Sequence, residues 1–381
     1  MSKGRAAQAL ITNYEEISVA ASDFVPERPR LSVVIPVWNG ENVLPRCLDA
    51  LKRSEYKDFE VLVVDDCSSD ATPRIADEYG VRYIRTAERR GPANARNIGA
   101  RNAMGDILVF VDADVLLAPN SLQMIAEDFE RKPEIAAVFG SYDDTPDCPA
   151  FFSQYKNLVH HYIHQASRES ASTFWAGCGA MRKSVFERFG GFDAARYKEP
   201  TIEDVALGME VTRAGHHILI DKHLMVKHLK RWTFFSLVRT DIFHRAVPWT
   251  RLILNTRNLP SDLNFDKRSR ASMALVAALT AAMALLALSP LHPRGQVQVL
   301  LAGVALTSAG LLLFINRRLY KFFRIKRGWR FAAKAVLSHW FYFVYGGITF
   351  AFVSLDHWIF RYFRRSKFSV KATASIKRDI S

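Results

Sequence analysis

The stretch DILVFVDADV, residues 106–115, decides the fold. Its apolar run is typical of a buried strand, and it leads directly into Asp112 and Asp114, which are separated by Ala113. Ionised carboxylates are costly to bury unless each finds a partner, so these acids either cap the next helix or hold a cation. If the strand extends through Asp114, both carboxylates point to the same side, which favours a Mg²⁺ or Mn²⁺ site that binds a diphosphate.

Strand and helix patterns alternate in the first half of the chain. Strand-like runs at 31–37, 59–66, 81–87 and 106–114 alternate with helical patterns at 40–54, 70–80 and 91–105. This spacing predicts an α/β domain whose mostly parallel sheet is covered by helices and binds ligands beyond the carboxyl ends of its strands. Asp65 and Asp66 lie at another of these ends. No GxGxxG or Walker lysine loop is present, which disfavours dinucleotide-binding and P-loop folds.

The composition indicates a polyanionic partner. The chain has 381 residues, a formal net charge of +14 and a pI near 9.7. Nucleic acid, an anionic membrane surface and phosphorylated substrates all fit this balance. The four cysteines form no CxxC pair, which disfavours a zinc site and favours a reducing compartment. The N-terminus has no long apolar core, so we expect no cleavable signal peptide.

The composition changes near residue 270. The runs 272–289 and 297–315 carry no charge and are long enough to span a bilayer, and 335–355 either spans or lies partly in the interface. Basic residues interleaved with aromatics at 316–334 suit a cytoplasmic membrane surface, as does the segment 232–255. The positive-inside rule then places the soluble domain in the cytoplasm, although three spans would put the basic tail outside. Membrane lipid explains the basic charge better than nucleic acid, which we do not expect as a partner.

Several blocks together resemble the family 2 inverting glycosyltransferases, which have the GT-A fold. They are VVIPVWNGENVLPRCLDAL, VLVVDDCSSDAT, GPANARNIGA, VFVDAD, FWAGCGAMRKSVFERFGGFD and IEDVALGMEVTRAGHHI, within residues 30–250. We therefore expect an extension at 1–29, a GT-A domain at 30–260, a transmembrane region at 271–356 and a basic tail at 357–381. Within the domain, 30–118 would bind the nucleotide, and 119–260 would hold the acceptor half and membrane-surface helices.

The resemblance also implies roles for individual residues. Nucleotide-sugar binding is expected of Pro36, Val37, Asn39, Glu41, Asp66 (to the nucleobase), Arg96, Asn97, Asp112 and Ala113. The metal, Mn²⁺ or Mg²⁺, would be held by Asp114, with Asp112 and His228. Asp204 would be the catalytic base, oriented by Glu203. The alternatives are that His228 is a surface histidine and that Glu203 and Asp204 only favour a helix N-terminus.

Acceptor binding is expected at Trp175, Gly177, Cys178 and Gly179, because Trp175 can stack on a sugar and the glycines allow close approach. Trp175 can equally be a core residue. His160 or His161 with His164 form a possible zinc pair, but an amphipathic helix explains them better.

A carboxylate base is needed for a hydroxyl acceptor but not for an already ionised phosphate. The chain also lacks the QxxRW pattern of processive synthases. We therefore expect a multi-pass protein of the bacterial inner membrane that transfers one sugar, from a UDP-sugar or another nucleotide diphosphate sugar, to a hydroxyl of a lipid or lipid-linked glycan. The alternatives are a polyprenyl-phosphate glycosyltransferase, a processive polysaccharide synthase and a non-catalytic membrane scaffold.

Overall fold

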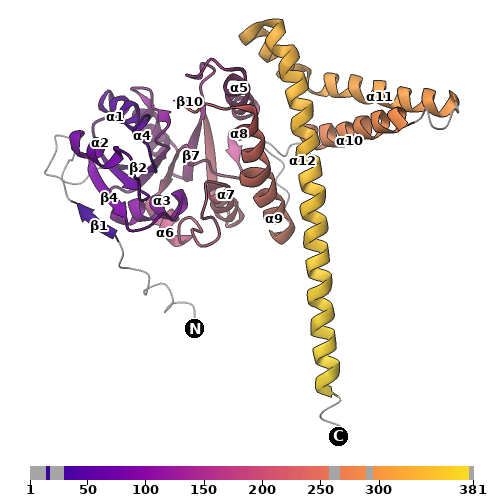
Figure 1. Cartoon of the computed structure of the whole chain (residues 1–381). Helices are drawn as coiled ribbons and strands as arrows, with labels where there is room; N and C mark the ends of the chain where they lie inside the picture. Colours follow the sequence, from indigo (N-terminus) through magenta and orange to yellow (C-terminus); the bar gives the residue numbers. More distant parts are fainter. Residues whose placement is uncertain (1–13, 18–29, 257–266, 289–294, 377–381) are drawn as a thin grey trace. The chain divides into compact units, whose positions relative to one another are not determined.

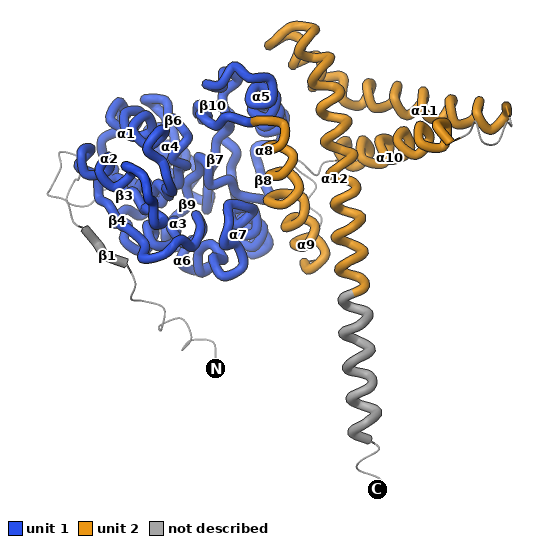
Figure 2. Tube along the Cα trace, in the orientation of Figure 1, with its two compact units in different colours: residues 1–232 blue, residues 233–381 orange. Residues whose placement is uncertain are grey.

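The protein divides into two compact units, residues 1–232 and 233–381 (Figure 2). The computed structural model describes residues 14–17, 30–256, 267–288 and 295–376, and the side chains of 30–256, 267–288 and 295–359. The predicted extension at 1–29 and tail at 357–381 therefore lie largely outside the residues whose side chains are described.

The first unit is a ten-stranded mixed sheet flanked by helices (Figure 1). Four parallel strands form its N-terminal half in the order β4-β3-β2-β5, and their bounds are β2 Leu31–Val37, β3 Phe59–Asp65, β4 Arg82–Thr86 and β5 Ile107–Val111. The helices between these strands are α1 Leu44–Lys52, α2 Thr72–Glu78 and α3 Pro92–Asn102. Strands β2, β3 and β5 are buried along their whole length, as mostly apolar strands in a covered parallel sheet should be. The predicted α/β architecture is confirmed.

The sheet continues beyond β5 with strands from the second half of the domain. The order is β5-β9-β7-β10-β6, with β9 antiparallel to both of its neighbours and β7 parallel to β10. The strands are β6 Val115–Leu116, β7 Ile135–Tyr142, β9 Cys178–Arg182 and β10 His217–His228. Short strands β1 Tyr14–Ile17 and β8 Ser170–Ala171 pair with β4 and β10, and the helices are α4 Ser121–Arg131, α5 Phe151–Ala166, α6 Lys183–Arg188 and α7 Glu203–Arg213.

One sequence-based expectation about the opening stretch is wrong. Strand β5 ends at Val111, and the amide of Val115 donates to the carbonyl of Asp112 at 3.0 Å, so the two acids lie in a turn. The amide of Asp112 donates instead to the carbonyl of Gly177 at 3.2 Å. Strand alternation therefore does not decide where the two carboxylates point.

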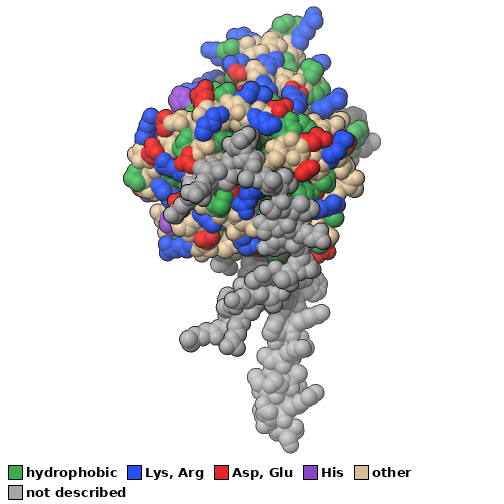
Figure 3. Space-filling view, turned by 90° about the vertical axis from the view of Figure 1, so that its left-hand side faces the viewer, with side chains coloured by type: hydrophobic (Ala, Val, Ile, Leu, Met, Phe, Trp, Pro, Cys, Tyr) green, Lys and Arg blue, Asp and Glu red, His purple; other side chains and the backbone are tan. Residues whose placement is uncertain are grey.

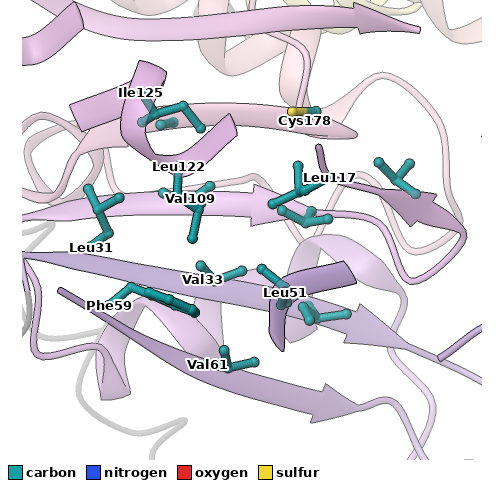
Figure 4. Close-up of a cluster of buried hydrophobic side chains, with 14 of the residues drawn as sticks. Leu31, Val33, Leu51, Phe59, Val61, Val109, Leu117, Leu122, Ile125 and Cys178 are labelled. Carbon is teal, nitrogen blue, oxygen red and sulfur yellow. The ribbon is translucent and has the colours of Figure 1, made fainter. Parts of the chain in front are cut away.

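A buried hydrophobic cluster holds the sheet and its helices together (Figure 4). Leu31, Val33, Phe59, Val61 and Val109 from the parallel strands pack with residues of α1 and α4. Apolar burial of this kind contributes roughly 25 cal/mol per Å² and makes the carboxyl edge of the sheet a rigid platform. On the face drawn in Figure 3, basic and acidic side chains are interspersed and do not form one basic field.

The second unit is helical. It begins with α8 Phe234–Arg239, the π-helix η1 Thr240–Ala246 and α9 Val247–Thr256. Within this unit, Asp241 of η1 is buried and accepts a hydrogen bond of 2.7 Å from the hydroxyl of Tyr345. Three long helices follow, α10 Lys267–Leu288, α11 Gly295–Ile315 and α12 Arg317–Ile376. Helix α12 is kinked at Gly328, where φ is 80° and ψ is 174°.

All three long helices are apolar and long enough to cross a membrane, over Lys267–Leu288, Gly295–Ile315 and Arg317–Ile359. They contain the three predicted apolar runs. Nδ2 of the Asn316 side chain donates to the hydroxyl of Ser272 at 2.9 Å, so polar side chains link α10 to the end of α11 within this unit. Such interhelical bonds are typical of membrane helix packing.

Candidate active site

The turn that follows β5 lies beside the end of β10. His228 pairs with Val115 across the β6–β10 ladder, and the amide of Leu229 donates to the carbonyl of Asp114 at 2.9 Å. This register brings Nε2 of His228 to 3.6 Å from Oδ2 of Asp114. The His228 ring also stacks on Tyr142 from the end of β7, with ring centroids 4.1 Å apart. A carboxylate oxygen and an imidazole nitrogen thus face each other at the carboxyl edge of the sheet.

The electrostatics of the turn differ between its two acids. Burial raises the pKa of Asp112, and the charge of Arg96 offsets this only in part. Burial alone would also raise the pKa of Asp114, but contact with His228 and the charge of Lys230 lower it below its usual range. Asp114 is therefore the acid that remains ionised most readily, as a cation ligand should.

Arg96 of α3 links this turn to the start of α7. Its guanidinium donates to Oδ1 of Asp112 at 2.6 Å and to Oε1 of Glu203 at 2.8 Å, and the side chain is only 5% exposed. Burial disfavours the Arg96 charge, but Asp112, Glu203 and Asp204 outweigh it and raise the pKa of Arg96. The other oxygen of Glu203 accepts from the amide of Thr201 at 3.0 Å. One buried arginine therefore holds the two acidic motifs together.

Asp204 is the second residue of α7. Its Oδ2 accepts a hydrogen bond of 2.9 Å from the amide of Ala176, and its Oδ1 accepts one of 2.8 Å from the amide of Val205. The side chain is largely buried, and the acids in the first turn favour the positive end of the helix dipole. Two backbone amides thus fix the orientation of this carboxylate.

The sequence and the fold of this domain match known proteins. Residues 32–190 match the family described as Glycosyl transferase family 2. The chain carries a family 2 glycosyltransferase domain. An uncharacterised glycosyltransferase of Haemophilus influenzae is 33% identical over 113 residues, which are 29% of this chain and 37% of that protein. The O-antigen chain rhamnosyltransferase RfbN of Salmonella typhimurium is 24% identical over 237 residues, 58% of this chain and 74% of that protein.

A solved structure shows the same fold over nearly the whole chain. The mannosyltransferase PcManGT from Pyrobaculum calidifontis, in complex with GDP-Man and Mn²⁺, superposes with a TM-score of 0.58 and 21% identity, covering 91% of this chain and 92% of that one. The predicted family resemblance and GT-A fold are confirmed. The chain spans just over a third of the length of the Haemophilus relative, at 37%.

The residues expected to bind the nucleotide are buried or form hydrogen bonds within the domain. Pro36 and Val37 are buried in β2, so only their backbone could reach a ligand. Oδ1 of Asn39 accepts from the amide of Ser69 at 2.9 Å, and Oε2 of Glu41 accepts from the amide of Ala71 at 3.2 Å. These side chains join the loop after β2 to the loop after β3.

Asp66 and Asn97 also have partners within the domain. The carboxylate of Asp66 is buried and accepts from the amides of Arg90 and Gly91 at 2.9 and 2.7 Å. Asn97 bonds the backbone of Phe192 in both directions, at 2.7 and 2.9 Å. These two side chains hold the backbone of neighbouring loops in place, and their contact with a nucleotide stays a prediction.

Trp38 is a candidate site residue that the sequence analysis did not name. It lies in the loop after β2, is 47% exposed and has the guanidinium of Arg89 3.7 Å above its ring. The signal was present in the sequence, because PVWNGEN puts a large aromatic immediately beyond a buried strand. An exposed indole at this edge can stack on a planar ligand.

Of the residues expected to bind the acceptor, Trp175 is partly buried, and Gly177, Cys178 and Gly179 are buried. Trp175 is partly buried among aromatic rings, with Tyr142, His160 and His164 at 4.9, 4.8 and 5.5 Å between centroids. A Cβ on Gly177 would lie 2.6 Å from the Trp175 indole, so the glycine is needed for that packing. Cys178 is fully buried in the core (Figure 4), where its side chain cannot reach an acceptor, and its burial raises the pKa of the thiol to about 12.

A Cβ on Gly179 would lie 2.3 Å from the carbonyl of Trp175, so this glycine also serves packing. The zinc pair suggested for the histidines of α5 stays untested, although the rings of His160 and His164 lie with their centroids 4.0 Å apart. Nδ1 of His161 lies 2.7 Å from the carbonyl of Tyr142, and Nδ1 of His164 lies 3.0 Å from that of Gly140. These rings help to attach α5 to the sheet.

A divalent ion fits the residues present. Asp114 and His228 offer the oxygen and nitrogen ligands that Mn²⁺ accepts. Within the described residues, no group of three or more His, Cys, Asp and Glu is arranged to hold a metal. Further ligands would therefore come from a donor diphosphate and water, as is usual for Mg²⁺-type sites that bind nucleotides.

Proposed function

We propose that this protein is an inverting glycosyltransferase that transfers one sugar from a nucleotide diphosphate sugar to a hydroxyl of a lipid or lipid-linked acceptor at the cytoplasmic membrane face. The observation that carries the proposal is the Arg96 bridge between Asp112 and Glu203. It joins a possible diphosphate site at Asp114 and His228 to a possible base at Asp204.

The donor would bind along the carboxyl edge of β2, β3 and β5. The exposed Trp38 would stack on the nucleobase, and the diphosphate would lie at Asp114 and His228, with Mn²⁺ or Mg²⁺ held by these two residues. The bound ion would neutralise charge on the leaving diphosphate. PcManGT, which shares the fold, is in complex with GDP-Man and Mn²⁺, and this supports a nucleotide sugar and a divalent ion here. Lys230 lies near both acids of the turn and would add positive charge there.

Asp204 would act as general base. The acceptor oxygen attacks C1 of the sugar from the face opposite the diphosphate, the C1–O bond to the diphosphate breaks, and the hydroxyl proton passes to the Asp204 carboxylate. An acceptor hydroxyl has a pKa far above 7, so removing its proton as the new bond forms lowers the barrier. The hydrogen bond from the Ala176 amide would hold the Asp204 carboxylate in a fixed orientation during this proton transfer.

Arg96 and Glu203 would position the reacting groups. Because Arg96 donates to Asp112, that carboxylate is fixed and half-neutralised, which leaves Asp114 as the principal metal ligand. Glu203 accepts hydrogen bonds from the second guanidinium nitrogen of Arg96 and from the amide of Thr201. These bonds connect the start of α7 to the donor half of the domain.

The acceptor would be membrane-bound. Three helices are apolar and long enough to cross a membrane, and relatives include an O-antigen chain rhamnosyltransferase. We propose a bacterial inner-membrane location and a role in making a cell-envelope glycan. The buried acid Asp204 favours a hydroxyl acceptor over a polyprenyl monophosphate, which needs no base.

Purified full-length protein in detergent tests the proposal. A panel of nucleotide sugars is offered with Mn²⁺ or Mg²⁺ to wild type, Asp114→Ala and Asp204→Asn. We expect one donor to be turned over, Asp114→Ala to lose donor binding, and Asp204→Asn to bind donor but fail in transfer. Full transfer by Asp204→Asn to a polyprenyl phosphate would instead support the second candidate, a polyprenyl-phosphate glycosyltransferase. Absence of donor binding with either metal would refute both.

A further inference from the structure

The segment from Arg317 to Lys334 concentrates positive charge between two apolar stretches. It contains eight Lys and Arg residues and no Asp or Glu, and the sequence has no acid at all between Asp266 and Asp356. The sequence of this part of the chain is therefore strongly positive. This segment, here called the basic elbow, lies between the apolar α11 and the apolar run 335–355.

The backbone of the basic elbow folds back at Gly328. The positive φ of 80° with a ψ of 174° interrupts the helix there, which glycine adopts without a Cβ penalty. The Phe323 ring lies 5.9 Å from Phe331, and Tyr320 lies 6.1 Å from His339. The helical turns before Gly328 thus pack one apolar face against the helix that follows it.

The opposite face of the basic elbow is exposed and cationic. Buried positions alternate with exposed ones at helical spacing, so Leu319 and Phe323 face inward while Lys321 and Arg324 face outward. The exposed cations are Arg317, Arg318, Lys321, Arg324, Lys326, Arg330 and Lys334. Ile325 and Trp329 are strongly exposed beside them. Exposed cations next to an exposed indole are typical of a surface at the headgroup level of a bilayer.

We propose that this outer face binds the phosphate groups of anionic phospholipids in the surrounding leaflet. The inference rests on the proposed function only in placing the chain in a membrane. The occupant follows from charge complementarity and from continuity, because the segment is joined on both sides to helices that can span a bilayer. Each Lys or Arg near an anionic surface is worth about five-fold in binding. Three removed cations should therefore weaken the association by up to about 100-fold.

Full-length protein in mixed micelles of a neutral detergent tests this inference. The titrants are dioleoyl-phosphatidylglycerol and, separately, dioleoyl-phosphatidylcholine, and the measured quantity is the mole fraction of lipid at half-saturation. The variant Lys321→Gln/Arg324→Gln/Arg330→Gln removes three outward cations of the basic elbow. The control Arg53→Gln/Arg101→Gln/Arg188→Gln removes the same charge from exposed positions of the first unit.

We expect the wild type to prefer phosphatidylglycerol, the elbow variant to need at least ten-fold more of it, and the control variant to stay within two-fold. Higher salt should weaken binding in the wild type and the control, because exposed charges are screened. Equal loss in both triple variants, or equal binding of the two lipids, would overturn the proposal. Competition by millimolar inorganic phosphate would overturn it in favour of a free-phosphate site.

Donor turnover is measured on the same samples. If wild type turns over no nucleotide sugar yet the elbow variant loses lipid binding, the proposed function fails and this inference stands. Melting temperatures of both triple variants within 2 °C of wild type would show that folding is intact. A lower melting temperature of the elbow variant in neutral detergent would attribute its effect to folding and count against the inference.

Discussion

Removing the Arg96 charge should destabilise the glycosyltransferase domain severely. In Arg96→Leu, two carboxylates lose the cation that compensates them. The ion pair between Arg96 and Glu203 is buried, because the Glu203 side chain is 5% exposed. A hydrogen bond between charged groups there is worth about 3 kcal/mol. The Asp112 side chain is 35% exposed, so solvent screening reduces its arm to about 1.5 kcal/mol. Their sum agrees with the 3–5 kcal/mol that breaking a buried ion pair costs.

This loss of unfolding free energy is measured as a melting temperature. For a unit of this size each kcal/mol shifts the midpoint by about 2–4 °C, so Arg96→Leu should melt about 10–15 °C below wild type. Arg96→Lys keeps the charge but cannot span both acids, and should lose about 2 kcal/mol. Differential scanning fluorimetry in detergent resolves these differences.

Arg101→Leu is the matched control. It lies on the same helix, α3, and its side chain is exposed, so it should shift the unfolding free energy by no more than about 0.5 kcal/mol. If Arg96→Leu melts within 2 °C of wild type, the bridge between the two acidic motifs does not hold the domain together. The positioning role argued from it would then be refuted.

Three further outcomes test the remaining parts of the site and the fold. Asp204→Asn should lower the transfer rate by about 10²–10⁴-fold while nucleotide-sugar affinity stays within two-fold, and an unchanged rate would exclude Asp204 as base. Trp38→Ala should weaken nucleotide binding by about 1 kcal/mol, as measured by calorimetry, and an unaltered affinity would show that the exposed indole does not stack on the nucleobase. Burial and the nearby Asp221 raise the pKa of Asp128 to about 6, so the folded chain keeps a proton that the unfolded chain releases, and stability should fall as pH rises from about 4 to 6. Asp128→Asn should therefore raise the melting temperature at pH 7.5 but not at pH 4, and an equal effect at both values would contradict this reasoning.

Local patterns allowed much of the first half of the fold to be predicted. The run LSVVIPV is β2 from its first residue to its last, because a strand buried on both faces needs a mostly apolar sequence, and its one polar residue, Ser32, bonds the buried Glu60. The end of β5 could not be read in this way. The chain turns after Val111, where the Asp112 amide donates to the carbonyl of Gly177, a residue just before β9 and far along the sequence.

Residue types in the site were easier to predict than their contacts. Asp114 and His228 were paired by resemblance, and their proximity in the structure results from the β6–β10 ladder. Asn39 and Glu41 were expected to face a ligand, but their side chains bond a loop about 30 residues away. Such long-range contacts leave no periodic trace in the sequence, so only the folded chain reveals them.

The bond between Arg96 and Glu203 joins residues 107 positions apart, which has a consequence for synthesis on the ribosome. At about 5–20 residues per second, Arg96 emerges roughly 5–20 s before its carboxylate partner exists. Until residue 182 has been added, which takes up most of that interval, the nascent donor half also lacks β9, the strand that covers the edge of β5. An open apolar strand edge invites pairing with other chains. Messages truncated before residue 203 should therefore yield products that depend on chaperones, whereas the complete chain protects its own edge once α7 and the last strands have been translated.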